Sequence, residues 1–219
     1  MTNNRSIREL IFKELLLLLG SHNKDVLLAL RLLCEQFVVE PLEVEDELWG
    51  YNQNRSTVTF LIEGVVAEYI RDGRKSNLLK IHKNRSFAFS EDVVLYKTPS
   101  KTLAKCIVPG KIAHISYHAM QDVFDRFNLT EVFISQLVEI SMTQYRQSTY
   151  ELLQSNGIRR ILAVIEEQPD VLELVPRSEL ADYLGISRAS LFRYLKQLNL
   201  YDANSEVCNS YQSVKNVSL

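Results

Sequence analysis

The most informative stretch of the sequence is Val175-Pro-Arg-Ser-Glu-Leu-Ala-Asp-Tyr-Leu-Gly-Ile-Ser-Arg-Ala-Ser-Leu-Phe-Arg-Tyr-Leu-Lys-Gln197. Pro176 suits the first position of a helix, where no backbone N–H is needed, and we expect this helix to end at Leu184. Gly185 has the backbone freedom that a tight turn requires. Ser187 is a natural N-cap for a second helix that ends near Leu198. The pattern therefore predicts two short helices joined by a tight turn.

The two predicted helices cross closely and share a small apolar core. Ala181, four residues before Gly185, provides the small side chain that a close crossing requires. The other core positions are expected to be Leu180, Leu184, Ile186, Leu191, Tyr194 and Leu195. This arrangement is typical of a helix-turn-helix.

The outer face of the second helix is predicted to be basic. Arg188, Ala189, Ser190, Arg193 and Lys196 lie on it, and residues 177–197 contain four basic side chains against two acidic ones. A helix fits the major groove of DNA, where an arginine can bond two acceptors on one guanine edge. We therefore expect double-stranded DNA as a partner. An ordinary helical hairpin with a solvated basic face is the alternative. The DNA-contacting residues are predicted to be Ser178, Ser187, Arg188, Ser190, Arg193 and Lys196.

Residues 37–115 are expected to form strands, because their apolar and polar residues follow a period near two. Short strands are predicted at Val58–Ile62, Gly64–Ile70 and Lys111–Ile115, separated by turn residues. Asp72-Gly73 lies between two such runs and suggests a hairpin. Regularly spaced short strands are typical of a small antiparallel barrel or roll.

Helical spacing of apolar residues occurs on both sides of this region. Residues 1–36 are predicted to be helical, and a long helix without Gly or Pro is predicted from Leu129 to Leu153. Its two apolar faces are Phe133, Leu137 and Ile140 on one side, and Val138, Met142, Tyr145, Thr149 and Leu152 on the other. Two faces indicate packing on the chain's own domain and on the partner helix of a homodimer. The alternative is a helix buried entirely within the chain. A further helix is expected over residues 158–167, ended by Pro169.

The composition is that of a globular protein, with 46% hydrophobic and 24% charged residues among 219. Because the net charge is −2, attraction to nucleic acid must come from a local basic patch. The longest apolar run is far shorter than the about 20 residues that span a bilayer. The amino terminus lacks the features of a signal peptide. We expect a cytoplasmic protein with no membrane partner.

The sequence contains no pattern that is typical of an enzyme active site or of a metal site. Cys34, Cys106 and Cys208 form no CxxC pair and are expected to be free thiols. Only His114 and His118 share the spacing of helical metal ligands, and His114 lies in a predicted strand. Neither a Ser-His-Asp signature nor a nucleotide-binding loop is found. We expect no catalytic residue, no metal and no cofactor.

These features resemble the CRP/FNR superfamily of bacterial transcription regulators, the cyclic-AMP receptor protein type. The resemblance covers about residues 30–200 and is strongest at the helix-turn-helix. Ser187-Arg188 matches the start of the family's recognition helix, and Arg193 matches a second contacting arginine. Residues 60–70 are similar to the family's strand-Gly-strand signature. Ala189 stands where well-known members have a base-reading Glu, so the operator is expected to differ.

The resemblance implies an α+β fold with three parts. These are a cyclic-nucleotide-binding-like β-roll over residues 1–118, a long dimerisation helix over 119–155, and a C-terminal (winged) helix-turn-helix domain over 156–219. It implies a dimeric, sequence-specific DNA-binding regulator that works with RNA polymerase and can respond to a small-molecule effector. The weakly patterned tail after Leu198 suggests a reduced wing. The alternative is a protein-interaction module whose degenerate helix-turn-helix no longer binds DNA.

The segment that resembles the family's nucleotide pocket is altered. Phe89-Ser-Glu-Asp-Val-Val-Leu-Tyr-Lys-Thr-Pro-Ser100 aligns without gaps with a segment that begins Phe-Gly-Glu and has a phosphate-binding Arg nine positions after the Glu. Glu91 is retained and is placed to accept from a ribose hydroxyl, whereas Ser90 replaces the Gly and Ser100 replaces the Arg. A hydrogen bond to a charged group contributes about 1.5–3 kcal/mol, so its loss lowers affinity roughly 10- to 150-fold.

Lys101 cannot replace this arginine if the segment is extended, because alternation then directs it to the other face. We therefore expect no tight binding of cyclic AMP. The candidate effector pocket, marked by Ser90, Glu91 and Ser100, is left for another ligand or for none.

Overall fold

The computed structural model describes residues 4–20, 23–73, 75–82, 84–153, 156–167 and 171–200. The predicted N-terminal helical region is a pair of helices, α1 (Asn4–Leu19) and α2 (Lys24–Gln36). They separate at Gly20, whose φ of +60° favours glycine. Their buried aliphatic side chains share one core with α4 (Tyr117–Arg126) and with residues of the roll.

The strands that follow form an antiparallel roll. Within the described residues they are β1 (Val38–Leu42), β2 (Glu47–Trp49), β3 (Thr57–Asp72), β4 (Lys75–His82), β5 (Ser86–Ala88) and β6 (Thr102–Ser116). The sheet has the order β1-β6-β3-β4, with β2 paired to β6 and β5 paired to β3. A short helix, α3 (Glu91–Val94), lies between β5 and β6. The hairpin predicted at Asp72-Gly73 is confirmed, because Asp72 pairs with Lys75.

One prediction about the roll is wrong. Gly64 does not separate two short strands but lies inside the continuous strand β3. Its φ is +105°, and a Cβ there would lie 2.7 Å from the carbonyl oxygen of Val108. Gly110 on β6 is more crowded still, since its Cβ would lie 2.1 Å from the carbonyl oxygen of Glu63. Two facing glycines thus let β3 and β6 bend together without breaking.

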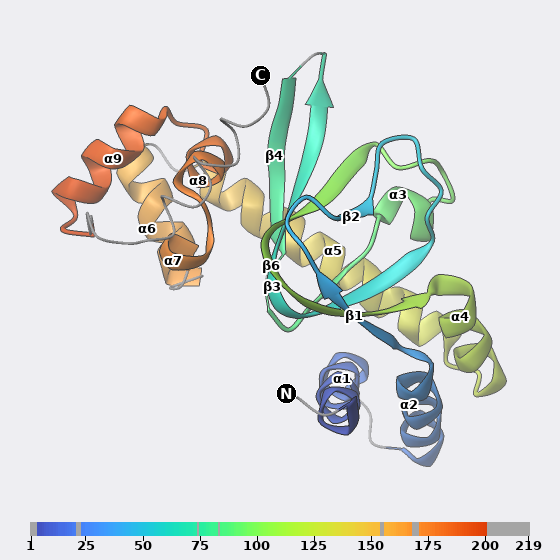
Figure 1. Cartoon of the computed structure of the whole chain (residues 1–219). Helices are drawn as coiled ribbons and strands as arrows, with labels where there is room; N and C mark the ends of the chain where they lie inside the picture. Colours follow the sequence, from blue (N-terminus) through green and yellow to red (C-terminus); the bar gives the residue numbers. More distant parts are fainter. Residues whose placement is uncertain are drawn as a thin grey trace.

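The long helix α5 (Thr130–Leu152) runs behind the roll and matches the helix predicted at Leu129–Leu153 (Figure 1). On its inner face, Phe133 and Leu137 are only 2% and 1% exposed. On a second face, Val138, Met142 and Tyr145 are 43%, 58% and 52% exposed. The alternative of a helix buried entirely within the chain is therefore wrong.

The described residues after Asn156 form four helices: α6 (Gly157–Glu167), α7 (Val171–Leu174), α8 (Arg177–Tyr183) and α9 (Arg188–Gln197). Helix α7 was not predicted, and Pro169 and the possible wing over residues 201–219 lie outside the described residues. Figure 1 shows this group beside β4. One apolar core joins it to the roll, with Val65, Ala67 and Ile107 on the strands meeting Leu180 and Ala181 on α8. Helices and an antiparallel sheet thus occupy separate regions, which confirms the α+β class.

Candidate functional site

The helix-turn-helix pattern is confirmed in its local details. Gly185 has a φ of +63°, and its N–H donates to the carbonyl of Asp182 at 3.1 Å. Ala181 is fully buried where α8 meets α9. The Ser187 hydroxyl caps α9 by accepting from the N–H of Ser190 at 3.1 Å. Pro176 is the N-cap of α8 and not its first residue, so the predicted start was wrong by one position.

Helix α6 packs against the inner side of α9. Leu191 and Leu195 are fully buried in the shared core. Tyr194 lies against Gly157 so closely that a Cβ on the glycine would be 2.5 Å from the tyrosine ring. The Arg160 guanidinium also donates to the carbonyl of Leu184, at the end of α8, at 3.0 Å. These contacts fix the inner side of α9 and leave its outer side to solvent.

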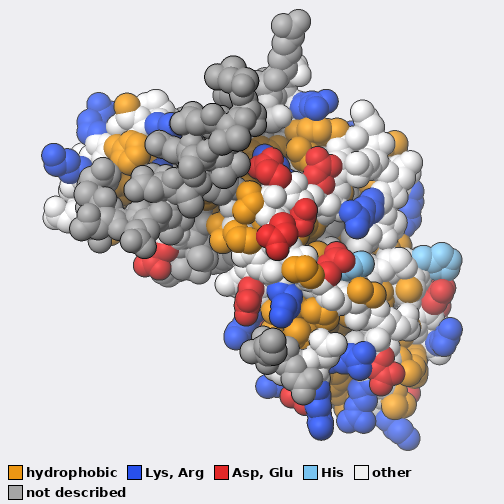
Figure 2. All heavy atoms as spheres, viewed as in Figure 1, with side chains coloured by type: hydrophobic (Ala, Val, Ile, Leu, Met, Phe, Trp, Pro, Cys, Tyr) orange, Lys and Arg blue, Asp and Glu red, His pale blue; other side chains and the backbone are white. Residues whose placement is uncertain are grey.

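The outer side of α9 is basic and exposed. Arg188, Arg193 and Lys196 are exposed together with Ala189, whereas Ser190 and Ser178 are half-buried. Arg193 lies 4.9 Å over the ring of Tyr194 and donates to its hydroxyl at 3.3 Å. Within the described part of the chain, these three cations of α9 form no ion pair with an acidic side chain. Figure 2 shows Lys and Arg side chains gathered at the outer end of the molecule where α9 lies in Figure 1.

The helix-turn-helix is also attached to the roll by a polar contact. The Tyr69 hydroxyl of β3 donates to Glu179 Oε2 of α8 at 2.7 Å. Glu179 is one of the two acidic side chains in residues 177–197, and Arg177 is one of the four basic ones. Arg177 donates to the carbonyl of Leu172, so this cation is held near α7.

The predicted dimer residues lie along one side of α5. Val138, Met142, Tyr145 and Thr149 are all exposed, and the side chain of Leu152 is outside the described ones. The spacing of four, three and four residues places them in a single stripe. This stripe is apolar over most of its described length, unlike the ordinary outer face of a surface helix.

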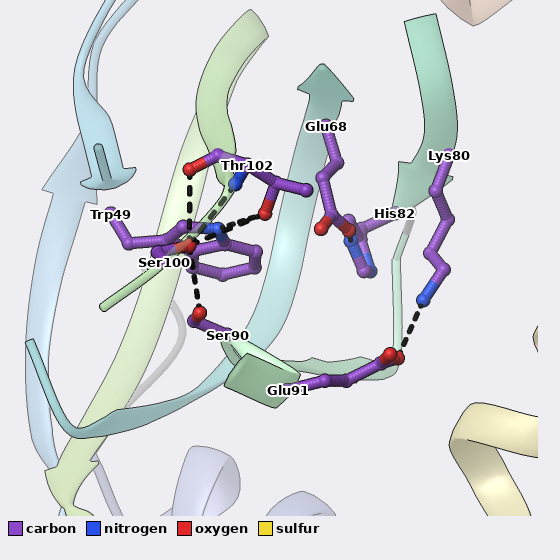
Figure 3. A network of polar contacts seen from close by, with 8 residues as sticks. All are labelled: Trp49, Glu68, Lys80, His82, Ser90, Glu91, Ser100 and Thr102. Atoms are coloured by element: carbon purple, nitrogen blue, oxygen red, sulfur yellow. Dashed lines mark hydrogen bonds and ion pairs between the residues drawn. The ribbon is translucent and has the colours of Figure 1, made fainter. Parts of the chain in front are cut away.

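The altered nucleotide segment has formed a polar network of its own (Figure 3). Ser90 and Ser100 are each 1% exposed, and the Ser90 hydroxyl donates to Ser100 Oγ at 2.8 Å. Ser100 in turn donates to the carbonyl of Thr102 at 3.1 Å. The indole N–H of buried Trp49 donates to Thr102 Oγ1 at 3.0 Å. The two positions that the resemblance links to the phosphate are therefore bonded to each other.

Glu91, the third predicted pocket residue, starts α3 and is paired with Lys80 of β4, with Nζ 3.0 Å from Oε1. Both side chains line a cavity of about 380 Å³ between β3, β4, α3 and α5. Ser90 and Ser100 are not among the lining residues. Contrary to the prediction from alternation, Lys101 reaches this cavity, and its Nζ lies 3.8 Å from Asp92 Oδ1.

A buried contact between His82 and Glu68 lies beside the cavity, which Glu68 lines. His82 Nε2 is 3.0 Å from Glu68 Oε2, and both side chains are less than a tenth exposed. Burial by itself would raise the pKa of Glu68. The hydrogen bond and charge of His82, the charge of Lys80 and a hydrogen bond from Thr102 outweigh burial and lower this pKa below its usual value. Glu68 is therefore held as a carboxylate.

The sequence missed several residues of this cavity. Glu68 belongs to β3 and Lys80 to β4, and nothing in the local sequence links them to Glu91. Ser141 of α5 also lines the cavity and is 8% exposed. Its position could have been found, because Phe133, Leu137 and Ser141 follow each other at intervals of four on the buried side of the helix.

Other candidate chemistry is not supported in the described residues. Cys34 and Cys106 are free and buried, and burial raises the pKa of their thiols to about 12 and about 11, respectively. Cys208 lies outside the described residues. Among the described residues, no group of three His, Cys, Asp or Glu side chains is placed to hold a metal ion. None of the helices described is long and apolar enough to span a membrane.

Comparison with solved structures shows what this fold is similar to. FixK2 from Bradyrhizobium japonicum matches 84% of this chain and 98% of its own, with a TM-score of 0.65 and 14% identity. A mutant of CooA from Carboxydothermus hydrogenoformans matches 84% and 89%, with a TM-score of 0.59 and 15% identity. The c-di-GMP-responsive global regulator CLP from Xanthomonas campestris matches 75% and 87%, with a TM-score of 0.57 and 18% identity.

These neighbours are regulators of the CRP/FNR family, so the predicted resemblance is confirmed at the level of the fold. No protein-family model matches the sequence, and no curated protein matches it either.

Proposed function

We propose that the chain is a dimeric, sequence-specific DNA-binding transcription regulator of the CRP/FNR type. The observation that carries the proposal is the outer face of α9, where Arg188, Arg193 and Lys196 stand exposed above a fully buried core. A helix presented in this way fits the major groove. In this proposal residues 1–118 are the sensor, 119–155 the dimerisation segment, whose dimerising helix is α5 and not α4, and 156–219 the DNA-binding domain. The protein acts in the cytoplasm, is not an enzyme, and works with RNA polymerase.

Base recognition is assigned to the start of α9. Arg188 follows the Ser187 cap at the end of the helix that enters the groove in helix-turn-helix proteins. Arg193 lies about 140° further round the helix in 3.6-residue geometry, so the two arginines reach opposite flanks of the groove. Lys196, Ser178, Ser187 and Ser190 are assigned to the phosphate backbone, where they set the position of the helix.

Dimerisation is assigned to the stripe of Val138, Met142, Tyr145, Thr149 and Leu152. Three of these side chains are large, apolar and 43–58% exposed in the single chain, which a copy of α5 would cover. Two-fold symmetry would then present two copies of α9 to two half-sites of the operator.

The effector is assigned to the cavity beside Glu91, and we propose that it is not cyclic AMP. Ser90 and Ser100 satisfy each other, and Glu91 is already paired with Lys80. A nucleotide phosphate would therefore find no free cation on the residues that the resemblance assigns to it.

Binding of the full chain to fragmented genomic DNA at a series of salt concentrations tests the proposal. Phosphate contacts make the logarithm of affinity fall linearly with the logarithm of salt, with a slope of about −0.9 per contact. We expect a subset of fragments to be retained, with a slope that corresponds to several contacts. A protein-interaction module would show neither selection nor a steep slope, and that result would reject DNA binding as the function.

A further inference from the structure

The cavity beside α3 has two kinds of wall. Ile70 and Leu79 come from the strands, and Val138 and Met142 come from α5. Its volume of about 380 Å³ is within the range of sites that hold small molecules. The polar wall is made by residues of β3, β4 and α3, several of which are drawn in Figure 3. The chemistry of a bound molecule must suit both walls.

The charged groups of the polar wall already have partners. Lys80 Nζ lies 3.0 Å from Glu91 Oε1, and Lys101 Nζ lies 3.8 Å from Asp92 Oδ1. The third carboxylate, Glu68, is bonded to His82. The cavity is thus lined by three carboxylates and two ammonium groups, with each ammonium group paired. An anion would have to displace Glu91 from the buried Lys80 and would meet the remaining negative charge. A cation would find each carboxylate already facing Lys80, Lys101 or His82.

One polar atom of the cavity lacks a partner. Ser141 is 8% exposed, and its hydroxyl has no hydrogen-bond partner within the described part of the chain. Buried hydroxyl groups in proteins are almost always hydrogen-bonded. Ser141 continues the buried side of α5 after Phe133 and Leu137, and it lines the cavity beside Val138, Met142 and Tyr145 of the exposed stripe. The unsatisfied hydroxyl therefore points to a ligand atom that would complete it.

We propose that this cavity binds an uncharged, largely apolar molecule with one oxygen or nitrogen atom that hydrogen-bonds Ser141. The apolar body lies against Leu79, Val138 and Met142, and the polar atom lies at α5. The inference rests on the proposed function only in treating this cavity as the effector site. It names a ligand class that differs from nucleotides in both charge and polarity.

Three eight-carbon probes test this assignment on the full chain, namely 1-octanol, octanoate and octylammonium. They share one apolar body and differ in the charge of the head group. We expect 1-octanol to raise the melting temperature and to bind at least tenfold more tightly than octanoate or octylammonium in calorimetric titration. Tighter binding of either charged probe, or no binding of 1-octanol, would overturn the proposal.

Substitution of Ser141 then locates the bound probe. Ser141→Ala removes the hydroxyl without adding bulk, and we expect 1-octanol to bind about five- to tenfold more weakly. The matched control is Ser135→Ala, on the same helix, whose exposed hydroxyl donates to the carbonyl of Glu131 and should leave affinity unchanged. Equal affinity of Ser141→Ala and the wild type would mean that the probe binds elsewhere. Because these titrations contain no DNA, their result is independent of whether the chain binds an operator.

Discussion

The charged groups around the cavity and those on the outer face of α9 differ in whether the protein gives them partners. Around the cavity, Lys80 and Lys101 each face a carboxylate, and Glu68 holds His82 at 3.0 Å. On α9, the described residues provide no acidic partner for Arg188 or Lys196. Charged side chains around the cavity are paired within the chain, whereas those on α9 are exposed and can contact a partner. A net charge of −2 for the chain conceals this difference.

The comparison separates two kinds of cation that composition cannot distinguish. A buried paired lysine is part of the structure, since removal of its partner leaves an uncompensated charge. An exposed unpaired arginine contributes little to stability and is free to neutralise a phosphate or read a base. Changes in the first region should therefore affect unfolding, and changes on α9 should affect DNA binding alone.

The largest effect on DNA binding is expected from α5. Met142→Glu combined with Tyr145→Glu places charges at the centre of the proposed dimer stripe, and sedimentation should show a monomer. Loss of simultaneous binding to two half-sites should weaken operator binding by about 10²–10⁴-fold. The matched control is Val132→Glu, an equally exposed position on α5 about 120° away from Val138 around the helix. A double variant that remains a dimer would contradict the assignment of the stripe.

The next effect concerns stability. His82→Leu removes the hydrogen-bond partner of the buried Glu68 carboxylate and leaves it only Lys80 and Thr102, which should cost up to about 3–5 kcal/mol in urea unfolding. DNA binding of the fraction that remains folded should not change. The matched control is His118→Leu, which removes an exposed histidine that lies 3.2 Å from Asp122.

The pH dependence of unfolding follows from the same pair. The pKa of Glu68 is lower in the folded chain than in the unfolded one, so its contribution is present above the unfolded value and is lost as pH falls through the folded value. Glu68→Gln should therefore reduce the loss of stability below about pH 4.5, near the ordinary pKa of a glutamate. An unchanged acid limb in Glu68→Gln would show that this carboxylate is not held by its partners.

A smaller effect is expected on α9, where specificity and affinity can be separated. Arg188→Ala should cost about 1–3 kcal/mol on the preferred operator and relax the preference at one base pair in each half-site. Lys196→Ala is the matched comparison. It should weaken all sequences almost equally and reduce the salt slope by about one contact, as expected for a phosphate contact. Titration against single-base operator variants distinguishes the two. An Arg188→Ala profile that only scales down would make Arg188 a backbone contact.

Features that depend on contacts between sequence neighbours could be predicted, whereas features that depend on contacts between distant residues could not. The helix-turn-helix depends on neighbours, because Gly185 turns the chain and Ser187 caps α9 three residues before its bonding partner. The bend of β3 depends on Gly64 meeting the β6 backbone around Pro109 and Gly110, and no local signal predicts such a contact. The cavity is likewise non-local. The loss of an arginine at position 100 was visible in the sequence, but not the Ser90–Ser100 bond or the pairing of Lys80 with Glu91.

The smallest expected effect is the response to cyclic AMP, which should be absent at micromolar concentration. Ligand stabilisation grows only when the concentration well exceeds the dissociation constant, so a weak ligand leaves the melting temperature unchanged. The physical reason lies in the polar network, where Ser90 and Ser100 are each 1% exposed and hydrogen-bonded to one another.

The double variant Ser90→Gly with Ser100→Arg would let the phosphate approach the backbone and would restore a cation. We expect this double variant to gain a measurable rise in melting temperature with cyclic AMP. A rise of several degrees in the unmodified chain would show that another cation, such as Lys80 or Lys101, leaves its carboxylate to bind the phosphate. The lysines of the cavity would then be available to a ligand, as the cations of α9 are to DNA, and the difference between the two regions would not hold.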